Sequence, residues 1–371
     1  MKNCLGIINL SEEEDKIKQL TKVRPIAGLP FAGRYRVIDF ILSNMVNNGI
    51  TNIGIFTHNK FRSLMDHIGS GKSWDLDRKR QGIKIFNPEY NYNSIVQKFG
   101  DIQHFYKNLD FLKKSKEDYI FISRSYMVCN INLSKAFKAH VDSDGDITVI
   151  YKKVKNDERY LNLDRLNIDA NGFLNKIGKN TGKAEGFNLS MEMYIMRKEV
   201  LIQLIENAIN NGDANFLKQA LFNQLDDFKV NTFPFDKYLA CINTNKNFYK
   251  ANLDMLNPKV YSELFNEKQD ILTKVKDEPS TMYYKDANVK NSLVANGCRI
   301  KGNVKNSIIF RNVKIEKGVN IENSIVMQNT TISKNSNLNH VISDKAVTIS
   351  EYKTLSGDKN NPYIIPKLKT L

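Results

Sequence analysis

The chain has 371 residues, of which 41% are hydrophobic and 26% charged, and its formal net charge is +15. That length allows two domains with cores of their own, and the absence of any run of about 18 apolar residues argues against a membrane span. The lysines are dispersed among acidic residues without a basic helix or an aromatic–basic pattern, so we expect no nucleic-acid partner.

The four cysteines lie far apart, at positions 4, 129, 241 and 298, without CxxC spacing. This spacing argues against a zinc ribbon and against a disulfide framework. The N-terminus leads directly into an apolar run and shows no export signal. Together these features predict a cytoplasmic protein.

Residues 1–255 alternate short apolar strands with helical stretches. Strands are predicted at 4–10, 52–56, 119–122 and 147–151, and helices at 60–67 and 199–208. Alternation of this kind predicts an α/β domain with a mostly parallel sheet covered by helices.

The sequence pattern changes after residue 255. Residues 256–282 predict a linker, and residues 283–371 lack helical periodicity. Apolar residues recur there every six positions, and an Asn-Ser pair repeats at 291, 306 and 323. A hexapeptide period with coils of 15 to 17 residues predicts a left-handed parallel β-helix.

One long motif carries a family resemblance. Residues 30–40 read Pro-Phe-Ala-Gly-Arg-Tyr-Arg-Val-Ile-Asp-Phe, followed by Leu-Ser-Asn at 42–44 and Asn-Gly-Ile at 48–50. This stretch resembles the start of the bacterial ADP-glucose pyrophosphorylases, which join glucose 1-phosphate to ATP and release pyrophosphate. The β-helix pattern is similar to the C-terminal domain of the same family. The resemblance implies a Rossmann-like nucleotidyltransferase domain followed by a left-handed β-helix.

The chain departs from that family first in the loop after residue 10. The family has a glycine-rich loop with an arginine that wraps the triphosphate, whereas this chain reads Ser11-Glu12-Glu13-Glu14-Asp15-Lys16. A phosphate loop needs close backbone N–H groups and no opposing negative charge. We therefore expect a degenerate phosphate loop at Ser11, Glu12 and Glu14, with Lys16 a degenerate catalytic position. The alternative is a solvated acidic turn.

The family's two magnesium-binding aspartates are also missing. The first falls on Ser125 or Tyr126, depending on where one residue is placed, and the second falls on Cys241. Magnesium prefers carboxylate oxygens, and a protonated thiol is a poor substitute. We expect no intact catalytic position and no metal site in this chain. Magnesium and ATP would be used by a catalytic partner.

Two further sets of residues correspond to family positions only in part. A remnant sugar-phosphate pocket is expected at Lys179, Ser190, Glu192 and Gly100, although Lys179 also fits an ordinary surface lysine. A loop with Trp74, Asp75 and Arg78 matches a family segment that transmits effector signals. Its alternative is a tryptophan that serves packing alone.

The resemblance is to the D-type, non-catalytic subunits of that family. It implies a regulatory subunit that assembles with the catalytic subunit of ADP-glucose pyrophosphorylase, in a heterotetramer, and responds to a phosphorylated metabolite. Three alternatives remain. One is a competent adenylyltransferase that uses Asp101 or Glu192 as metal ligands. The others are a sugar-phosphate or nucleotide sensor without turnover and a β-helix scaffold without a ligand.

Overall fold

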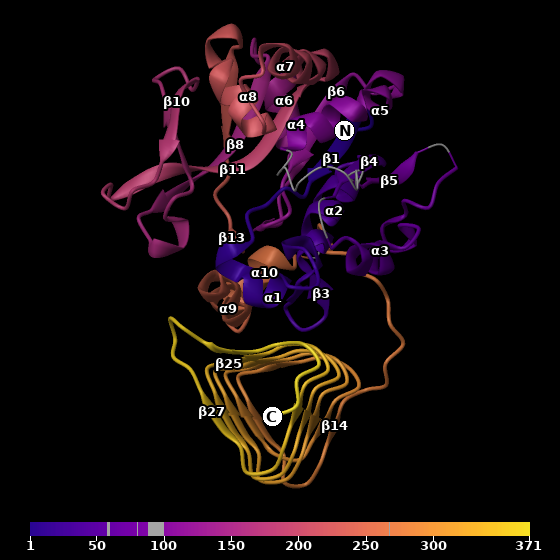
Figure 1. Ribbon diagram of the computed structural model, residues 1–371, viewed down its shortest axis with the longest axis vertical. Helices are drawn as coiled ribbons and strands as arrows, with labels where there is room; N and C mark the ends of the chain where they lie inside the picture. The colour runs from indigo at the N-terminus through magenta and orange to yellow at the C-terminus, as the bar shows by residue number, and fades with distance from the viewer. Residues whose placement is uncertain (58–59, 80, 88–99, 267) are drawn as a thin grey trace.

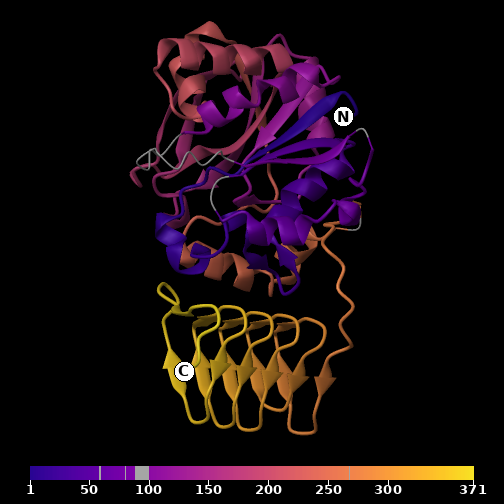
Figure 2. The ribbon, with the colours of Figure 1, turned by 45° about the vertical axis from the view of Figure 1, so that its right-hand side comes forward.

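The computed structural model describes residues 1–57, 60–79, 81–87, 100–266 and 268–371. An α/β domain lies above a triangular β-helix, and an extended segment that precedes the β-helix connects the two (Figures 1 and 2). This arrangement confirms the predicted fold class.

The α/β domain is built on one large sheet. Its strands are β1 (Cys4–Asn9), β4 (Asn52–Phe56), β5 (Gly82–Phe86), β6 (Tyr119–Ser123), β8 (Ile147–Lys155), β9 (Asp164–Ile168), β10 (Leu174–Lys179), β11 (Gly186–Arg197) and β12 (Val230–Pro234). The order is β10-β9-β11-β6-β1-β4-β5, and β8 pairs with both β11 and β12. Strands β6, β1, β4 and β5 run parallel, so their C-terminal ends share one edge.

Helices cover both faces of the sheet. They are α1 (Lys18–Thr21), α2 (Val37–Asn47), α3 (Arg62–Ile68), α4 (Asp101–Lys107), α5 (Leu109–Lys114), α6 (Leu133–Val141), α7 (Lys198–Asn211), α8 (Leu217–Asn223), α9 (Asn245–Asp254) and α10 (Pro258–Leu264). Strand β1 is buried on both faces, since Ile8 packs in one core with α2 and Ile7 in another with α4 and α7. This burial explains its continuous apolar run. None of the helices in the described ranges has the length and apolar character to cross a membrane.

Two small antiparallel strand pairs complete this domain. Strand β2 (Pro30–Phe31) pairs with β3 (Tyr35–Arg36), and β7 (Met127–Val128) pairs with β13 (Ala240–Cys241), both antiparallel. The first pair lies in the motif at 30–40. The second brings the segment after β6 against a segment more than 100 residues away.

The β-helix consists of short parallel strands in three sheets. They are β14 (Met282–Tyr283), β15 (Asn288–Lys290), β16 (Leu293–Val294), β17 (Arg299–Ile300), β18 (Asn303–Lys305), β19 (Ile308–Ile309), β20 (Lys314–Ile315), β21 (Asn320–Glu322), β22 (Ile325–Val326), β23 (Thr331–Ile332), β24 (Asn337–Asn339), β25 (Val341–Ser343), β26 (Thr348–Ile349), β27 (Thr354–Ser356) and β28 (Tyr363–Ile365). Each coil contributes one strand to each sheet.

The repeated asparagines occupy the corners of the coils. Asn291, Asn306 and Asn323 have φ angles of 43°, 48° and 49°. Asparagine tolerates this left-handed region better than most residues do. Their side chains also bond from coil to coil, since Asn291 donates to Asn306 and Asn306 donates to Asn323. The asparagines of the Asn-Ser repeat therefore serve the left-handed backbone at the corners of the coils.

The β-helix packs directly against the α/β domain. Ile308, Ile325 and Ile342 from one of its sheets belong to the same hydrophobic core as β1 and α2. A buried ion pair joins Arg24 to Asp344 across this seam. The segment expected to be a linker also contributes, because it contains helix α10, whose Leu264 is fully buried.

We expect Asp344→Asn to lower the free energy of unfolding by about 3–5 kcal/mol, because it leaves the Arg24 charge buried without its partner. Urea denaturation measures this change. The matched control is Glu322→Gln, which removes an exposed partner of Lys305 and should cost less than about 1 kcal/mol. Equal losses in the two variants would contradict the role of the seam pair.

Candidate functional site

The candidate site lies where β1 and β6 end. Ser11 follows β1 and Arg124 follows β6, and because these strands are parallel neighbours the two residues meet. Arg124 Nη1 donates to Ser11 Oγ at 2.6 Å. Ser11 Oγ donates to Asp101 Oδ2 at 2.7 Å, and Asn9 Nδ2 donates to the same oxygen at 2.7 Å. The chain's own polar groups thus satisfy one another at this edge of the sheet.

Glu12 turns inward from the acidic loop. Its Oε1 accepts hydrogen bonds from the backbone N–H and from the hydroxyl of Ser125, both at 2.8 Å. Burial raises the pKa of the Glu12 carboxyl, while the nearby Arg124 charge lowers it in part. A carboxylate therefore occupies the N–H and hydroxyl donors that follow β6.

The rest of the loop faces outward. Glu14 forms an ion pair with Lys60 at 2.6 Å and accepts a hydrogen bond from the backbone N–H of Ile26 at 3.1 Å. Lys16 is exposed. Glu12 therefore lies inside the site, whereas Lys16 lies at the surface.

Arg124 is the central cation of the site. Its guanidinium lies 3.6 Å from Asp101 and 3.3 Å from Glu192, with the side chain 12% exposed. Burial lowers the pKa of Arg124, but the carboxylates of Glu192, Asp101 and Glu12 raise it above its usual value. Its charge is permanent and already compensated by the protein.

Glu192 reaches the site through an irregularity in β11. The pairing of β11 with β8 shifts register between Ser190 and Met193, and Glu192 has a φ of 51°. A non-glycine residue in the left-handed region is strained by about 1–2 kcal/mol. The carboxylate compensates by accepting from Tyr126 Oη at 2.7 Å and by pairing with Lys218 at 3.3 Å.

Lys179 and Lys218 meet at a buried aspartate. Asp164 pairs with Lys179 at 2.7 Å and also with Lys218. Asp164 is 2% exposed, whereas the Lys179 side chain is 57% exposed. We call the connected set the ion network; its members are Glu12, Asp101, Arg124, Asp164, Lys179, Glu192 and Lys218.

The other expected pocket residues have backbone roles. Gly100 precedes α4, and a Cβ there would lie 1.7 Å from the carbonyl oxygen of Asn215. The close approach of the Asn215 backbone therefore explains why this position is a glycine. Ser190 is buried, and its Oγ accepts the backbone N–H of Glu192 at 3.2 Å. It fixes the bend that aims Glu192 into the ion network.

The two positions that carry metal ligands in the resembling family do come together. Cys241 pairs with Met127 across β13 and β7, and the N–H of Ile242 donates to the carbonyl oxygen of Tyr126 at 2.8 Å. Burial, with a smaller contribution from Glu192, raises the pKa of the Cys241 thiol well above its usual value. The thiol therefore stays protonated beside a tyrosine.

These residues do not fit a divalent cation. Asp101 and Glu192, the alternative ligands, both face the Arg124 guanidinium. Within the described ranges, no group of three or more His, Cys, Asp or Glu side chains has a metal-holding arrangement. The Arg124 guanidinium therefore already pairs with the carboxylates that a metal ion would need.

The expected signal loop is divided between core and surface. Trp74 is fully buried and its ring meets His67 edge-on at 5.8 Å. His67 Nε2 lies 2.6 Å from Asp39 Oδ1. Asp75 and Arg78 are exposed and pair with each other. The tryptophan thus contacts a buried polar pair.

Sequence reasoning missed Asp164 and Lys218. Neither lies in a motif, and they are 54 positions apart in the chain. Only the fold brings β9 and α8 to the same place. Arg124 and Asp101 were noticed in the sequence, but their pairing depends on the start of α4 lying beside the end of β6.

Comparisons with known proteins agree with this architecture. A family model for nucleotidyl transferases matches residues 15–237, and one described as GlmU-like, C-terminal hexapeptide matches residues 279–361. The glycogen biosynthesis protein GlgD of Bacillus subtilis is 34% identical over 85% of this chain and 81% of its own length. Glucose-1-phosphate adenylyltransferase of Clostridium novyi is 28% identical over 85% of this chain and 83% of its own.

The fold and the site thus define a nucleotidyl transferase architecture with a β-helix attached. The chain belongs to the nucleotidyl transferase family that includes the GlgD proteins.

We expect Glu192→Gln to destabilise the protein most at neutral pH. Although burial raises the pKa of Glu192, the charges of Lys218 and Arg124 lower it below its ordinary value. The stabilisation is therefore complete above the unfolded-state pKa of about 4.3 and is lost as the pH falls through the folded-state pKa. Urea denaturation should give a loss of about 3 kcal/mol at pH 7 that shrinks below pH about 4.

Glu12→Gln is the control with the opposite sign. Since the pKa of Glu12 is raised, the parent protein should lose stability as the pH rises through that value. The variant should lack this loss. A pH-independent effect of Glu192→Gln would show that its charge contributes nothing.

Proposed function

We propose that this chain is a non-catalytic, regulatory subunit of a glucose-1-phosphate adenylyltransferase in glycogen biosynthesis, acting with a separate catalytic subunit. The ion network carries the proposal. Its cations, which could otherwise hold phosphates, are paired with carboxylates of the same chain. The names of the similar GlgD and adenylyltransferase proteins support the pathway and the reaction.

The physical obstacle to catalysis is the strength of that pairing. A triphosphate would have to displace Glu12 from Ser125 and separate Arg124 from Glu192. Breaking a buried ion pair costs about 3–5 kcal/mol. A nucleotide would also bring negative charge close to the carboxylates that remain. These costs act before any chemical step.

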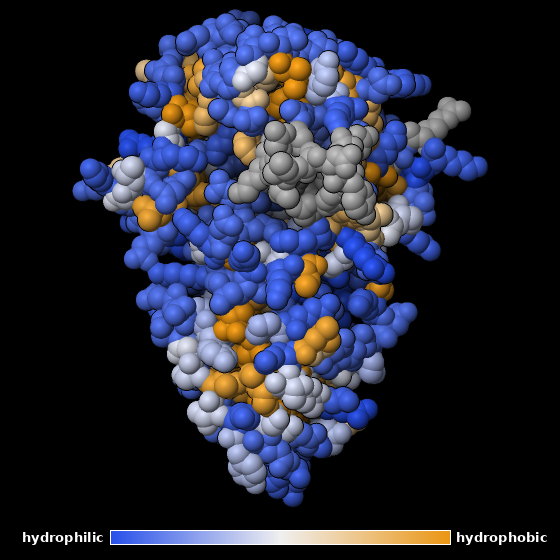
Figure 3. Space-filling view, in the orientation of Figure 1, coloured by the Kyte–Doolittle hydropathy of each residue, from blue (hydrophilic) through white to orange (hydrophobic). Residues whose placement is uncertain are grey.

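A regulatory role needs a surface for the catalytic partner. In Figure 3 the upper domain is mostly hydrophilic, whereas hydrophobic residues gather over the β-helix end that faces the viewer. The last coils carry exposed Tyr352, Tyr363 and Leu368. Strands β26, β27 and β28 end their sheets among the described residues. We propose this end of the β-helix as a contact for the partner within a heterotetramer.

A second observation favours a phosphorylated effector. A small pocket at the seam is lined by Arg34, Arg36, Lys274, Lys276 and Arg311. Burial, together with neighbouring arginines, lowers the pKa values of Arg36, Lys276 and Arg311. Burial is the main cause of these lowered pKa values, and an anion in the pocket would offset it by favouring the charged forms.

Lys345 is a further buried cation whose pKa is lowered by burial and by the charge of Arg36. It is 8% exposed, and burial with the charges of Arg36 and Arg24 lowers its pKa to about 6, against a smaller opposing contribution from Asp344. Arg36 N–H donates to Asp39 at 2.9 Å, and Asp39 pairs with His67, which contacts Trp74. A ligand that contacts Arg36 at the seam would thus be connected to the buried Trp74 through Asp39 and His67.

The main prediction is that this chain alone releases no pyrophosphate from ATP and glucose 1-phosphate with magnesium. Mixed with the catalytic subunit of the same cell, it should raise the rate above that of the partner alone. A coupled pyrophosphate assay measures both. Turnover by this chain alone would favour the alternative of an adenylyltransferase with unusual ligands. An unchanged rate in the mixture would contradict a regulatory role.

The effector proposal predicts that sulfate, a phosphate analogue whose own charge is constant between pH 6 and pH 8, binds the chain and that its binding weakens from pH 6 to pH 8. Lys345 is mostly neutral at pH 7, so an anion that raises its pKa requires proton uptake. Calorimetry of the parent, Arg311→Gln and the remote control Lys334→Gln tests this. Only Arg311→Gln should weaken binding, by about tenfold. Equal affinity at both pH values would contradict the involvement of Lys345.

A further inference from the structure

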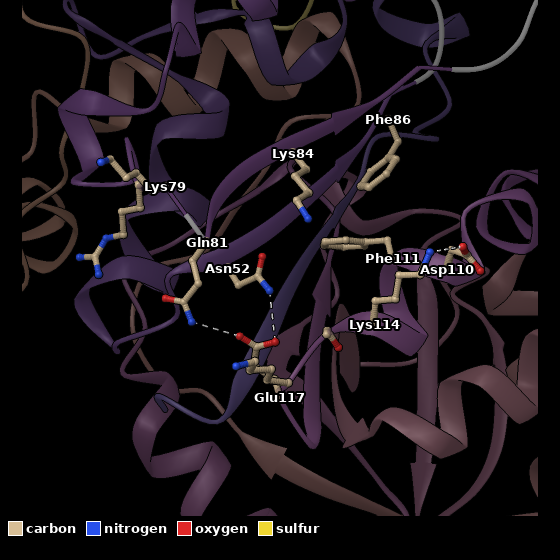
Figure 4. A pocket seen from close by; sticks show the side chains of 12 residues that line it. Asn52, Lys79, Gln81, Lys84, Phe86, Asp110, Phe111, Lys114 and Glu117 are labelled. Carbon is tan, nitrogen blue, oxygen red and sulfur yellow. Dashed lines mark hydrogen bonds and ion pairs between the residues drawn. The ribbon is translucent and has the colours of Figure 1, made fainter.

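We propose that a groove beside strand β5 is a binding site for a nucleoside phosphate, separate from the ion network and from the seam pocket. The groove has a volume of about 700 Å³ and lies between β5, helix α5 and the loop before β6. We call it the β5 groove; it is lined by Asn52, Arg78, Lys79, Gln81, Lys84, Phe86, Asp110, Phe111, Lys114, Ser115, Lys116 and Glu117. Figure 4 shows their side chains.

The groove lies at the edge of the sheet, because β5 is the last strand in the strand order. On β4, Gly54 is paired with Lys84. A Cβ at Gly54 would lie 2.6 Å from Phe111 Cε1, so the glycine lets the Phe111 ring settle against the sheet. Phe111 and Phe86 then form an aromatic wall, with ring centroids 4.9 Å apart. Nothing in the described ranges pairs with the outer edge of β5.

The charge of the groove favours an anion. Five basic side chains line it and only two acidic ones do. Both carboxylates are occupied, since Asp110 pairs with Lys114 and Glu117 accepts from Asn52 and Gln81. Lys84 Nζ instead sits 5.0 Å from the centre of the Phe111 ring. Among the described residues, no carboxylate pairs with Lys79, Lys84 or Lys116.

The third feature of the groove is a buried hydrogen-bond acceptor without a partner. Asn52 is 8% exposed, and its amide nitrogen donates to Glu117 at 3.1 Å. Its Oδ1 is buried and has no hydrogen-bond partner. In Figure 4 this oxygen points away from Glu117, toward the side of the groove that holds Lys84. An unsatisfied buried acceptor costs about 1–3 kcal/mol, which a ligand N–H or O–H would recover after a small opening of the floor.

A nucleoside phosphate combines these three features. Its phosphates suit the free lysines, its planar base suits the wall of Phe86 and Phe111, and its base and ribose supply donors for Asn52. The cavity lies within the range of about 300–1,000 Å³ typical of small-molecule sites. An inorganic phosphate would pair with the lysines but would make no stacking contact with Phe86 or Phe111.

The test compares a nucleotide with its two parts. Calorimetry on the full chain without magnesium would use ADP, adenosine and inorganic pyrophosphate as probes. ADP should bind more tightly than either part. Lys84→Gln combined with Lys116→Gln should weaken ADP binding by about tenfold, the size expected when a charge-assisted contact is lost. Both lysines are exposed, so the variant should melt at the temperature of the parent.

Three control variants locate the bound ADP. Lys179→Gln alters the ion network, Arg311→Gln the seam pocket, and Lys334→Gln a remote site on the β-helix. None should change ADP affinity. Weakening by either of the first two alone would overturn the assignment to the β5 groove. Pyrophosphate that binds as tightly as ADP, and is weakened equally by the Lys84→Gln and Lys116→Gln double variant, would overturn the nucleoside part. An oligonucleotide that binds while ADP does not would overturn the proposal.

Because this experiment measures binding by the chain alone, it is independent of the proposed regulatory function. The pyrophosphate assay of the mixture can fail while ADP binds the groove, and the reverse also holds.

Discussion

The pairing of Arg124 with carboxylates of its own chain is the interaction on which the candidate site depends. Glu192 and Asp101 approach the guanidinium directly, and Glu12 takes the donors of Ser125 beside it. In a buried setting such charges must be compensated, and here the protein itself does so. The polar groups at this edge of the sheet are thus bonded to one another.

The second constraint is the seam between the two domains. One sheet of the β-helix shares a hydrophobic core with α2, and Arg24 reaches Asp344 across it. The seam also holds Lys345, and burial together with the charges of Arg36 and Arg24 lowers the pKa of Lys345 to about 6. A ligand there would act on an interface that both domains need, which is the physical requirement for transmitting a signal.

Much of the fold was predictable from the sequence. The strands at 4–9, 52–56 and 119–123 were visible as apolar runs, and the β-helix was visible in its hexapeptide period. Helix α10 was missed, because a short helix that begins at Pro258 looks like part of a linker. The family resemblance implies carboxylates at position 125 or 126 and at position 241, where the sequence has Ser125, Tyr126 and Cys241.

The sequence by itself determined the architecture, because the apolar strand runs and the hexapeptide period are local patterns. It also showed which residue types stand at 125, 126 and 241. The tertiary structure alone decided which side chains pair with one another. Glu12 and Ser125, or Asp164 and Lys218, are far apart in the chain and become partners only when strand ends and helices converge. The compensation of buried charge is a property of three-dimensional proximity, and no local pattern encodes it.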